Sequence, residues 1–260
     1  MPFAPINGVD LFYESHGSGP AVVFLHGRGG NHLSWWQQVP HFAKRYRAIA
    51  IDQREFGLTK DLEDGPGRKA FADDLHQFLD HLQIDRACLV GQSMGGFTAL
   101  SFAVRAPDRV AGLVLADTTG GIVSADIRSE IGKNVPKLPA DAALRAISPG
   151  FFKREPGLAF LYGAIGRLSP PIRESLEDLL KNEDGPTLAD LADWAVYKVP
   201  ALVIVGSEDV IIPPVIAHMV AAHLPGAKLE TVPGAGHSVY FEKPAEFNAL
   251  LDTFLATLRF

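Results

Sequence analysis

The sequence contains a single cysteine, Cys88, among its 260 residues. An intrachain disulfide is therefore excluded, and because Cys88 lies in the apolar run RACLVG, we expect a buried core residue and not a nucleophile. No apolar stretch reaches the roughly 18 residues typical of a membrane-spanning helix. The opening residues MPFAPINGVDLFYESHG lack the basic start and apolar run of a signal peptide. These absences favour a cytoplasmic protein without a membrane partner.

Clusters of positively charged residues are also scarce in the sequence. The net charge is −6, and the longest basic grouping, Lys44, Arg45 and Arg47, is interrupted by Tyr46 and is expected at a solvated helix end. Phosphate binding needs clustered lysine and arginine, so nucleic acid is excluded as the main partner. Hydrophobic residues make up 47% of the chain, which is ample for the core of a large domain.

Runs rich in valine, isoleucine and leucine alternate with helical patterns on either side of a middle stretch. Such runs are typical of strands covered on both faces, so the alternation predicts an α/β fold with a mostly parallel sheet flanked by helices. We expect a core at 1–118 and 199–260 and an inserted helical cap at 119–198. Expected strands are 9–15, 21–26, 46–52, 86–91, 110–116, 200–206 and 227–232, and expected helices are 35–42, 69–82, 94–105, 214–223 and 245–258.

The segment GQSMGG at 91–96 follows an expected strand and opens an expected helix. This is the context of a G-x-S-x-G nucleophile elbow, in which a sharp turn exposes the serine hydroxyl at the carboxyl edge of the sheet. Ser93 is therefore the candidate nucleophile. The alternative is a glycine-rich turn without a catalytic role.

A serine hydroxyl needs a base, and the base needs an acid that holds its tautomer. His237, in a glycine-flanked loop after an expected strand, is the candidate base. Asp209, which directly follows another expected strand, is the candidate acid, and the order Ser93, Asp209, His237 is typical of hydrolases. Glu208 and Asp117 are the rival acids, since both also follow strand ends.

The other histidines do not indicate a metal site. Two pairs lie on expected helices at a spacing of five residues, which differs from the i, i+4 spacing of zinc ligands on one helical face. We expect surface positions for His76, His81, His218 and His223, and also for His16, His32 and His41.

The segment HGRGGN at 26–31 follows an expected strand and is rich in glycine, which lets a backbone approach a substrate closely. It lacks the lysine of a phosphate-binding loop and the full spacing of a dinucleotide site. We expect an oxyanion hole made of the backbone amides of Arg28 and Met94, with His26 bracing the loop.

Five motifs follow one another along the chain: HGRGGN at 26–31, DQREFG at 52–57, GQSMGG at 91–96, GSED at 206–209 and GAGH at 234–237. Together and in this order they resemble the α/β-hydrolase superfamily over essentially the whole chain. The resemblance implies an eight-stranded, mostly parallel sheet, a helical cap at 119–198, and acyl-enzyme chemistry without a metal or an organic cofactor. The chain is similar to esterases, enol-lactonases and carbon–carbon bond hydrolases, whereas Ser93 argues against the haloalkane dehalogenases and epoxide hydrolases, which use aspartate.

One position departs from the family pattern. Many relatives have D-x-R-G-x-G where this chain has Glu55 in place of the first glycine, and we expect Glu55 at the surface.

Several aromatic residues suggest the kind of substrate. Trp35, Phe152 and Trp194 are the candidate substrate-binding residues of an apolar pocket. No cluster of arginine or lysine marks a strongly anionic substrate, although Arg28 could contact one.

The leading hypothesis is a serine hydrolase, either a carboxylesterase or a lactonase, that cleaves a small or medium carboxylic ester or lactone through an acyl-enzyme intermediate. Its partner would then be that small-molecule substrate. Two alternatives remain open. One is a carbon–carbon bond hydrolase of ring-cleavage products, and the other is a small-molecule receptor of the same fold with slow or no turnover.

Overall fold

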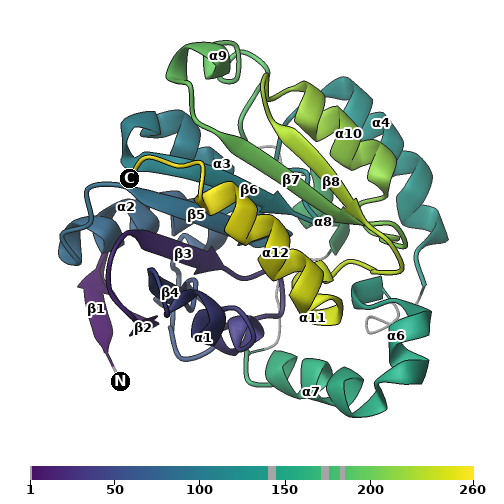
Figure 1. Ribbon diagram of the computed structural model, residues 1–260, viewed down its shortest axis with the longest axis horizontal. Coiled ribbons are helices and arrows are strands. Elements are labelled where there is room, and N and C mark those ends of the chain that lie inside the picture. Colours follow the sequence, from purple (N-terminus) through teal and green to yellow (C-terminus); the bar gives the residue numbers. More distant parts are fainter. Residues whose placement is uncertain (1, 140–144, 171–175, 182–184) are drawn as a thin grey trace.

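The computed structural model of the chain describes residues 2–139, 145–170, 176–181 and 185–260. Its strands are β1 (Phe3–Ile6), β2 (Val9–His16), β3 (Ala21–Leu25), β4 (Arg47–Ile51), β5 (Ala87–Gln92), β6 (Val110–Ala116), β7 (Ala201–Gly206) and β8 (Lys228–Val232). They form one sheet in the order β1-β2-β4-β3-β5-β6-β7-β8 (Figure 1). Strand β2 is antiparallel to β1 and β4, and all other neighbours are parallel. The expectation of an eight-stranded, mostly parallel sheet is confirmed.

The inner strands are mostly apolar, as is typical where both faces of the sheet are covered. In β3, Val22 and Phe24 pack on one side of the sheet, and Val23 and Leu25 pack on the other. Cys88 of β5 is fully buried on the same side as Phe24, and burial raises the pKa of its thiol. The sheet therefore separates two apolar layers, and Cys88 belongs to the core.

Helices cover both faces of the sheet. On one face lie α2 (Phe71–His81), α3 (Met94–Arg105), α4 (Ala125–Asn134) and α10 (Pro214–Ala222), and on the other lie α1 (Val39–Phe42), α11 (Val239–Glu242) and α12 (Pro244–Leu255). The expectation of one helix over 35–42 is wrong in extent. The chain forms a 3-10 turn at His32–Trp35 and then the short α1, whose Pro40 fits only the first turn of a helix.

The segment between β6 and β7 adds further helices, namely α6 (Pro149–Arg154), α7 (Pro156–Gly166), α8 (Leu176–Lys181) and α9 (Trp194–Tyr197). Ser124 and Ser148 cap the first turns of α4 and α6 with their side chains. Figure 1 shows α6 and α7 beside the carboxyl ends of the parallel strands, toward which the strand arrows point. The insertion therefore lies next to the edge of the sheet where Ser93 is expected.

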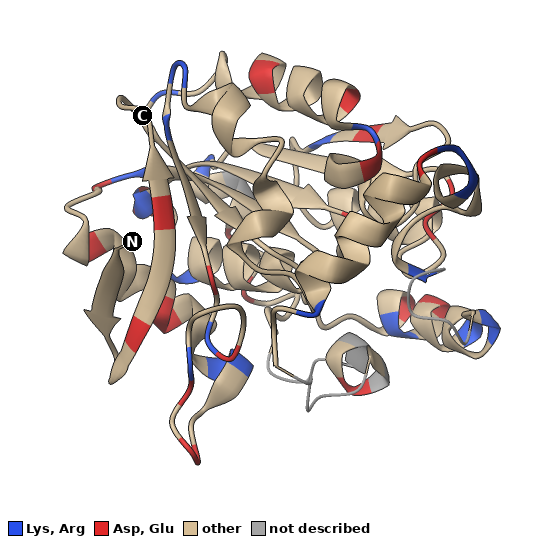
Figure 2. Cartoon of the chain, turned by 90° about the horizontal axis from the view of Figure 1, so that it is seen from below, with Lys and Arg blue, Asp and Glu red and all other residues tan. Residues whose placement is uncertain are grey.

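Charged side chains are dispersed over the molecule. In the view of Figure 2, basic and acidic residues both occur along the loops and helices of the described ranges. None of the helices in the described ranges combines the length and the apolarity that crossing a bilayer requires.

Candidate active site

Ser93 lies at the turn between β5 and α3. Its backbone has φ 49° and ψ −118°, a positive-φ conformation that residues other than glycine rarely adopt. The turn is tight, because a side chain on Gly91 would collide with the backbone of Gly95, and one on Gly95 would collide with the carbonyl of Leu25. This geometry is that of a nucleophile elbow and holds the Ser93 hydroxyl at the carboxyl edge of the sheet.

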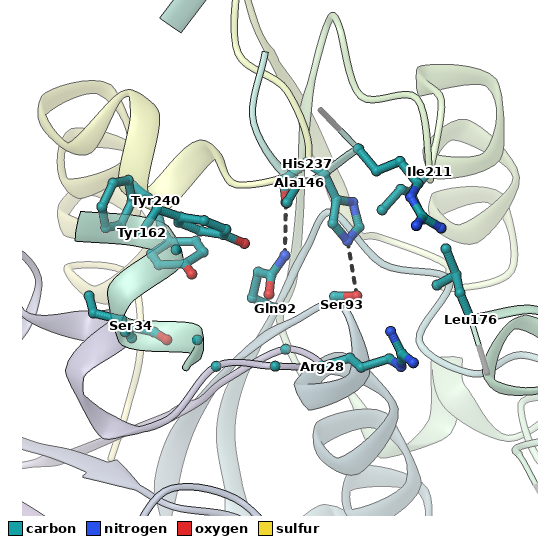
Figure 3. Close-up of a pocket in the computed structure, with 18 residues that line it drawn as sticks. Arg28, Ser34, Gln92, Ser93, Ala146, Tyr162, Leu176, Ile211, His237 and Tyr240 are labelled. Atoms are coloured by element: carbon teal, nitrogen blue, oxygen red, sulfur yellow. Dashed lines mark hydrogen bonds between the residues drawn. The ribbon is translucent and has the colours of Figure 1, made fainter. Parts of the chain in front are cut away.

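Side chains from three strand ends form one chain of hydrogen bonds. Nε2 of His237 lies 3.0 Å from the hydroxyl oxygen of Ser93, as Figure 3 shows, and Nδ1 of His237 lies 2.8 Å from Oδ2 of Asp209. Oδ1 of Asp209 accepts the backbone N–H groups of Ile211 and Ile212 at 2.8 and 2.9 Å. The structure thus brings together a hydroxyl, a base and an acid in the arrangement that nucleophilic catalysis needs.

Among the described contacts, neither of the two rival acids bonds to the ring of His237. Glu208 is exposed to solvent, whereas Asp209 is buried beside the ring of His237. Asp117 is fully buried, but its carboxylate accepts the backbone N–H groups of Gly206 and Val239 at 3.0 and 3.1 Å. The contacts of Asp117 therefore join the ends of β6 and β7 to the start of α11, and Asp209 is the acid that bonds to the histidine.

Opposing effects act on the pKa of His237. Burial lowers this pKa, but the charge and the hydrogen bond of Asp209 raise it, with smaller contributions from Asp117 and Glu242, and the pKa lies above the ordinary histidine value. Burial and the Asp209 charge also raise the pKa of Asp117 well above its usual range. The surrounding carboxylates therefore favour the imidazolium that forms when His237 takes a proton from Ser93.

Two residues that the sequence analysis did not single out hold the histidine loop. Gln92 donates from its amide to the carbonyl of His237 at 2.8 Å (Figure 3). The buried carboxylate of Glu242 accepts the N–H of Gly236 at 2.9 Å and the N–H of Ser148 at 3.0 Å. Gln92 occupies a variable position of the nucleophile motif, and Glu242 belongs to no motif, so neither carried a signal in the sequence.

The loop after β3 lies against the nucleophile. A side chain on Gly27 would collide with Gln92 and approach Ser93, so the loop backbone lies directly beside the serine. His26 is fully buried, accepts the N–H of Gln53 at 3.1 Å and accepts the side chain of Gln53 at its own carbonyl at 2.8 Å. Burial lowers the pKa of His26, which favours the neutral ring that this contact needs. His26 and Gln53 thus hold the loop that carries Arg28.

A cavity of about 360 Å3 opens at Ser93 and His237. Its size lies within the range of small-molecule sites. Polar groups lie on two sides of the cavity, since Figure 3 shows the tyrosine hydroxyls across Ser93 from the side chain of Arg28. Its lining includes Arg28 and Arg145, the hydroxyl-bearing Ser34, Tyr162 and Tyr240, and the apolar Ile165, Leu176, Ile211 and Phe241.

The three aromatic residues expected in the pocket lie outside this cavity. Trp35 is fully buried and packs against Phe24 and Tyr240 in the core. Trp194 is buried in the apolar layer on the opposite face of the sheet, and Phe152 is 41% exposed to solvent. The expectation is wrong because an aromatic side chain is equally suited to a core and to a pocket. The aromatic residues that do line the cavity are Tyr162, Tyr240 and Phe241.

Two further expectations need correction. His32 is not a surface residue, since its ring is largely buried and its Nδ1 lies 2.8 Å from Asp52. Glu55 is half-buried in the wall of a second cavity of about 890 Å3, which also contacts Arg28 and Met94. Its φ of 70° is a backbone conformation that favours glycine, the residue that the resemblance implied at this position.

Metal ligands do not gather near the site. In the described ranges, no group of three or more histidine, cysteine, aspartate or glutamate side chains is arranged to hold a metal ion. The ionisable side chains at the site include His237, which bonds to Ser93, Asp209, which bonds to His237, and the arginines that line the cavity.

Comparison with known proteins agrees with this architecture. The model of the alpha/beta hydrolase family matches residues 22–250. The acetyltransferase component of the acetoin cleaving system of Cupriavidus necator is 33% identical and aligns over 97% of this chain and 68% of its own. A thermophilic esterase from Thermogutta terrifontis superposes with a TM-score of 0.79 at 26% identity, covering 98% of this chain and 96% of its own. Est816, described as an N-acyl homoserine lactone degrading enzyme, has the same TM-score and identity and covers 97% and 100%. The chain belongs to the α/β-hydrolase family.

Proposed function

We propose that the protein is a serine hydrolase that cleaves small or medium carboxylic esters or lactones through an acyl-enzyme intermediate. The observation that carries this proposal is the hydrogen-bonded chain from Ser93 through His237 to Asp209, which opens into a cavity of small-molecule size. The likeness to an esterase and to a lactone-degrading enzyme supports the substrate class.

In the first half of the reaction, the Ser93 oxygen attacks the substrate carbonyl while His237 accepts the hydroxyl proton. The negative charge that develops on the carbonyl oxygen is stabilised by the backbone N–H groups of Arg28 and Met94. Met94 is suited to this role because it is the first residue of α3, where N–H groups have no partner within the helix. The carbon–oxygen bond to the leaving group then breaks, and His237 donates its proton to the departing oxygen.

In the second half, water attacks the acyl-enzyme carbonyl and gives a proton to His237. The bond between the acyl carbon and the Ser93 oxygen then breaks, His237 returns the proton to that oxygen, and the carboxylic acid is released. Asp209 keeps the Nδ1 proton of His237 in place throughout. The helices inserted between β6 and β7 serve as a cap, because Tyr162, Ile165 and other residues of the insertion form part of the cavity wall. A cap of this kind excludes bulk water and sets the size of the acyl group.

The test is hydrolysis of p-nitrophenyl esters with acyl chains of two to eight carbons by the wild type and by Ser93→Ala. We expect kcat to fall by about four to six orders of magnitude in the variant, with a circular dichroism spectrum like that of the wild type. Simple lactones, followed by acid release, test the second substrate class in the same way. Equal turnover by the two proteins would show that Ser93 is not the nucleophile.

A further inference from the structure

The cavity at Ser93 contains two arginines from distant parts of the sequence. Arg28 belongs to the loop after β3, and Arg145 lies in the inserted segment between β6 and β7, ahead of α6. Figure 3 shows the Arg28 side chain extending past Ser93 on the side away from Tyr162 and Tyr240. The fold thus converts two isolated arginines of the sequence into a pair at one site.

The charge of the cavity wall is opposite to that of the whole chain. The net charge of the protein is −6, yet the described residues that line this cavity include both arginines and no aspartate or glutamate. The two guanidinium groups therefore favour an anion at the part of the wall that they form.

The chemistry of the guanidinium group specifies which anion fits. Arginine stays charged at any physiological pH and presents a planar fork of donors that matches the two oxygens of a carboxylate. Arg28 and Arg145 also make contacts within the protein, but each guanidinium has five N–H donors and can bind a ligand beside those contacts. The apolar neighbours Leu176 and Ile211 lower the local dielectric and strengthen such a pairing.

We propose that the natural ester or lactone carries a carboxylate, and that Arg28 and Arg145 bind this carboxylate while Ser93 attacks the carbonyl. The inference rests on the proposed function and adds a substrate class to it. Because Arg145 lies in the insertion and Arg28 in the core, the bound carboxylate would contact both parts of the cavity wall at once. The hydroxyl of Tyr162, which accepts a hydrogen bond from Ser238 at 2.9 Å, and that of Tyr240 lie across Ser93 from Arg28.

The experiment measures binding to Ser93→Ala, which cannot consume the ligand. The probes are monomethyl succinate, glutarate and adipate, each compared with its neutral dimethyl ester by isothermal titration calorimetry. We expect at least one monomethyl ester to bind about tenfold or more tightly than its dimethyl ester, as a charge-assisted hydrogen bond requires. In the Ser93→Ala protein, the additional substitution Arg145→Gln should remove most of this preference, whereas Arg145→Lys should retain part of it.

Arg128→Gln is the matched control, because Arg128 lies exposed on α4 and its removal changes the net charge equally. The preference should survive in this variant. If no monoester is preferred over its dimethyl ester, or if Arg145→Gln and Arg128→Gln behave alike, the inference is overturned. Turnover of neutral p-nitrophenyl esters reports the proposed function separately, so Ser93-dependent hydrolysis without a carboxylate preference would refute the inference alone.

Discussion

At the scale of single residues, the roles of Asp209 and Asp117 differ although both carboxylates are buried near His237. Asp209 bonds to the ring nitrogen, while Asp117 accepts the backbone N–H groups of Gly206 and Val239. We therefore expect Asp209→Asn to lower kcat by about 10⁴-fold, because an amide no longer holds the catalytic tautomer. The loss of kcat in Asp117→Asn should be at least about a hundredfold smaller than the loss in Asp209→Asn. Steady-state kinetics with p-nitrophenyl butyrate checks this, and equal losses in the two variants would contradict the assignment of the acid.

The pH dependence of the reaction follows from the raised pKa of His237. The base must be neutral, so kcat/KM should rise with pH, with a midpoint above the ordinary histidine value of 6.5. Burial lowers this pKa and the Asp209 charge raises it, so Asp209→Asn should move the midpoint to lower pH. Profiles of kcat/KM between about pH 5 and 9 for both proteins test this, and a midpoint that stays unchanged would exclude Asp209 as the source of the shift.

At the scale of elements, Glu242 connects the inserted helices with the histidine loop. Its carboxylate accepts N–H groups from Ser148, at the start of α6, and from Gly236, beside His237. Glu242→Ala should reduce the free energy of unfolding by about 2 to 4 kcal/mol, because two buried N–H groups lose their acceptor, and it should also lower kcat. Urea denaturation measures the first effect. Glu242→Gln, which keeps one acceptor oxygen, should lose less, and a larger loss in Gln than in Ala would argue against this bridge.

Arg54 holds a second set of elements together. It bonds to Asp74 of α2 at 2.8 and 2.9 Å, to Asp61 at 2.7 Å, and to the carbonyl of Asn7 in the β1–β2 turn. Arg54 is 1% exposed, so Arg54→Met would leave two carboxylates without their cation at a cost of about 3 to 5 kcal/mol. Chemical denaturation measures this loss. The exposed Arg128→Met is the control, with an expected change within about 0.5 kcal/mol, and equal effects of the two substitutions would show that the buried network adds nothing.

At the scale of the whole molecule, local patterns in the sequence were sufficient to predict the sheet and the position of Ser93. Continuous apolar runs marked the inner strands, and the glycines around Ser93 marked the turn that only small residues allow. Strand β1, with its four residues FAPI, carried no such pattern, because it lies at the sheet edge and contains proline.

The cavity wall could not be predicted in the same way. Arg145 and Tyr162 lie in a segment whose helices are interrupted by proline and glycine, and only the folded chain brings them beside Arg28. Trp35 was expected in the pocket, but its apolar surface fits a core equally well, and it packs against Phe24 in the core. Sequence patterns report the periodicity of an element, whereas a pocket depends on contacts between residues that are far apart in the chain.

The most direct test of the central claim is covalent labelling by an organophosphonate ester, which reacts with an activated serine. Intact-mass measurement and peptide mapping locate the adduct in the wild type, in Ser93→Ala and in Asp209→Asn. We expect a single adduct on Ser93 in the wild type, no adduct in Ser93→Ala, and much slower labelling in Asp209→Asn because His237 is a poorer base there. An adduct on another residue, or unmodified Ser93 after long exposure, would contradict the assignment of Ser93 as the nucleophile.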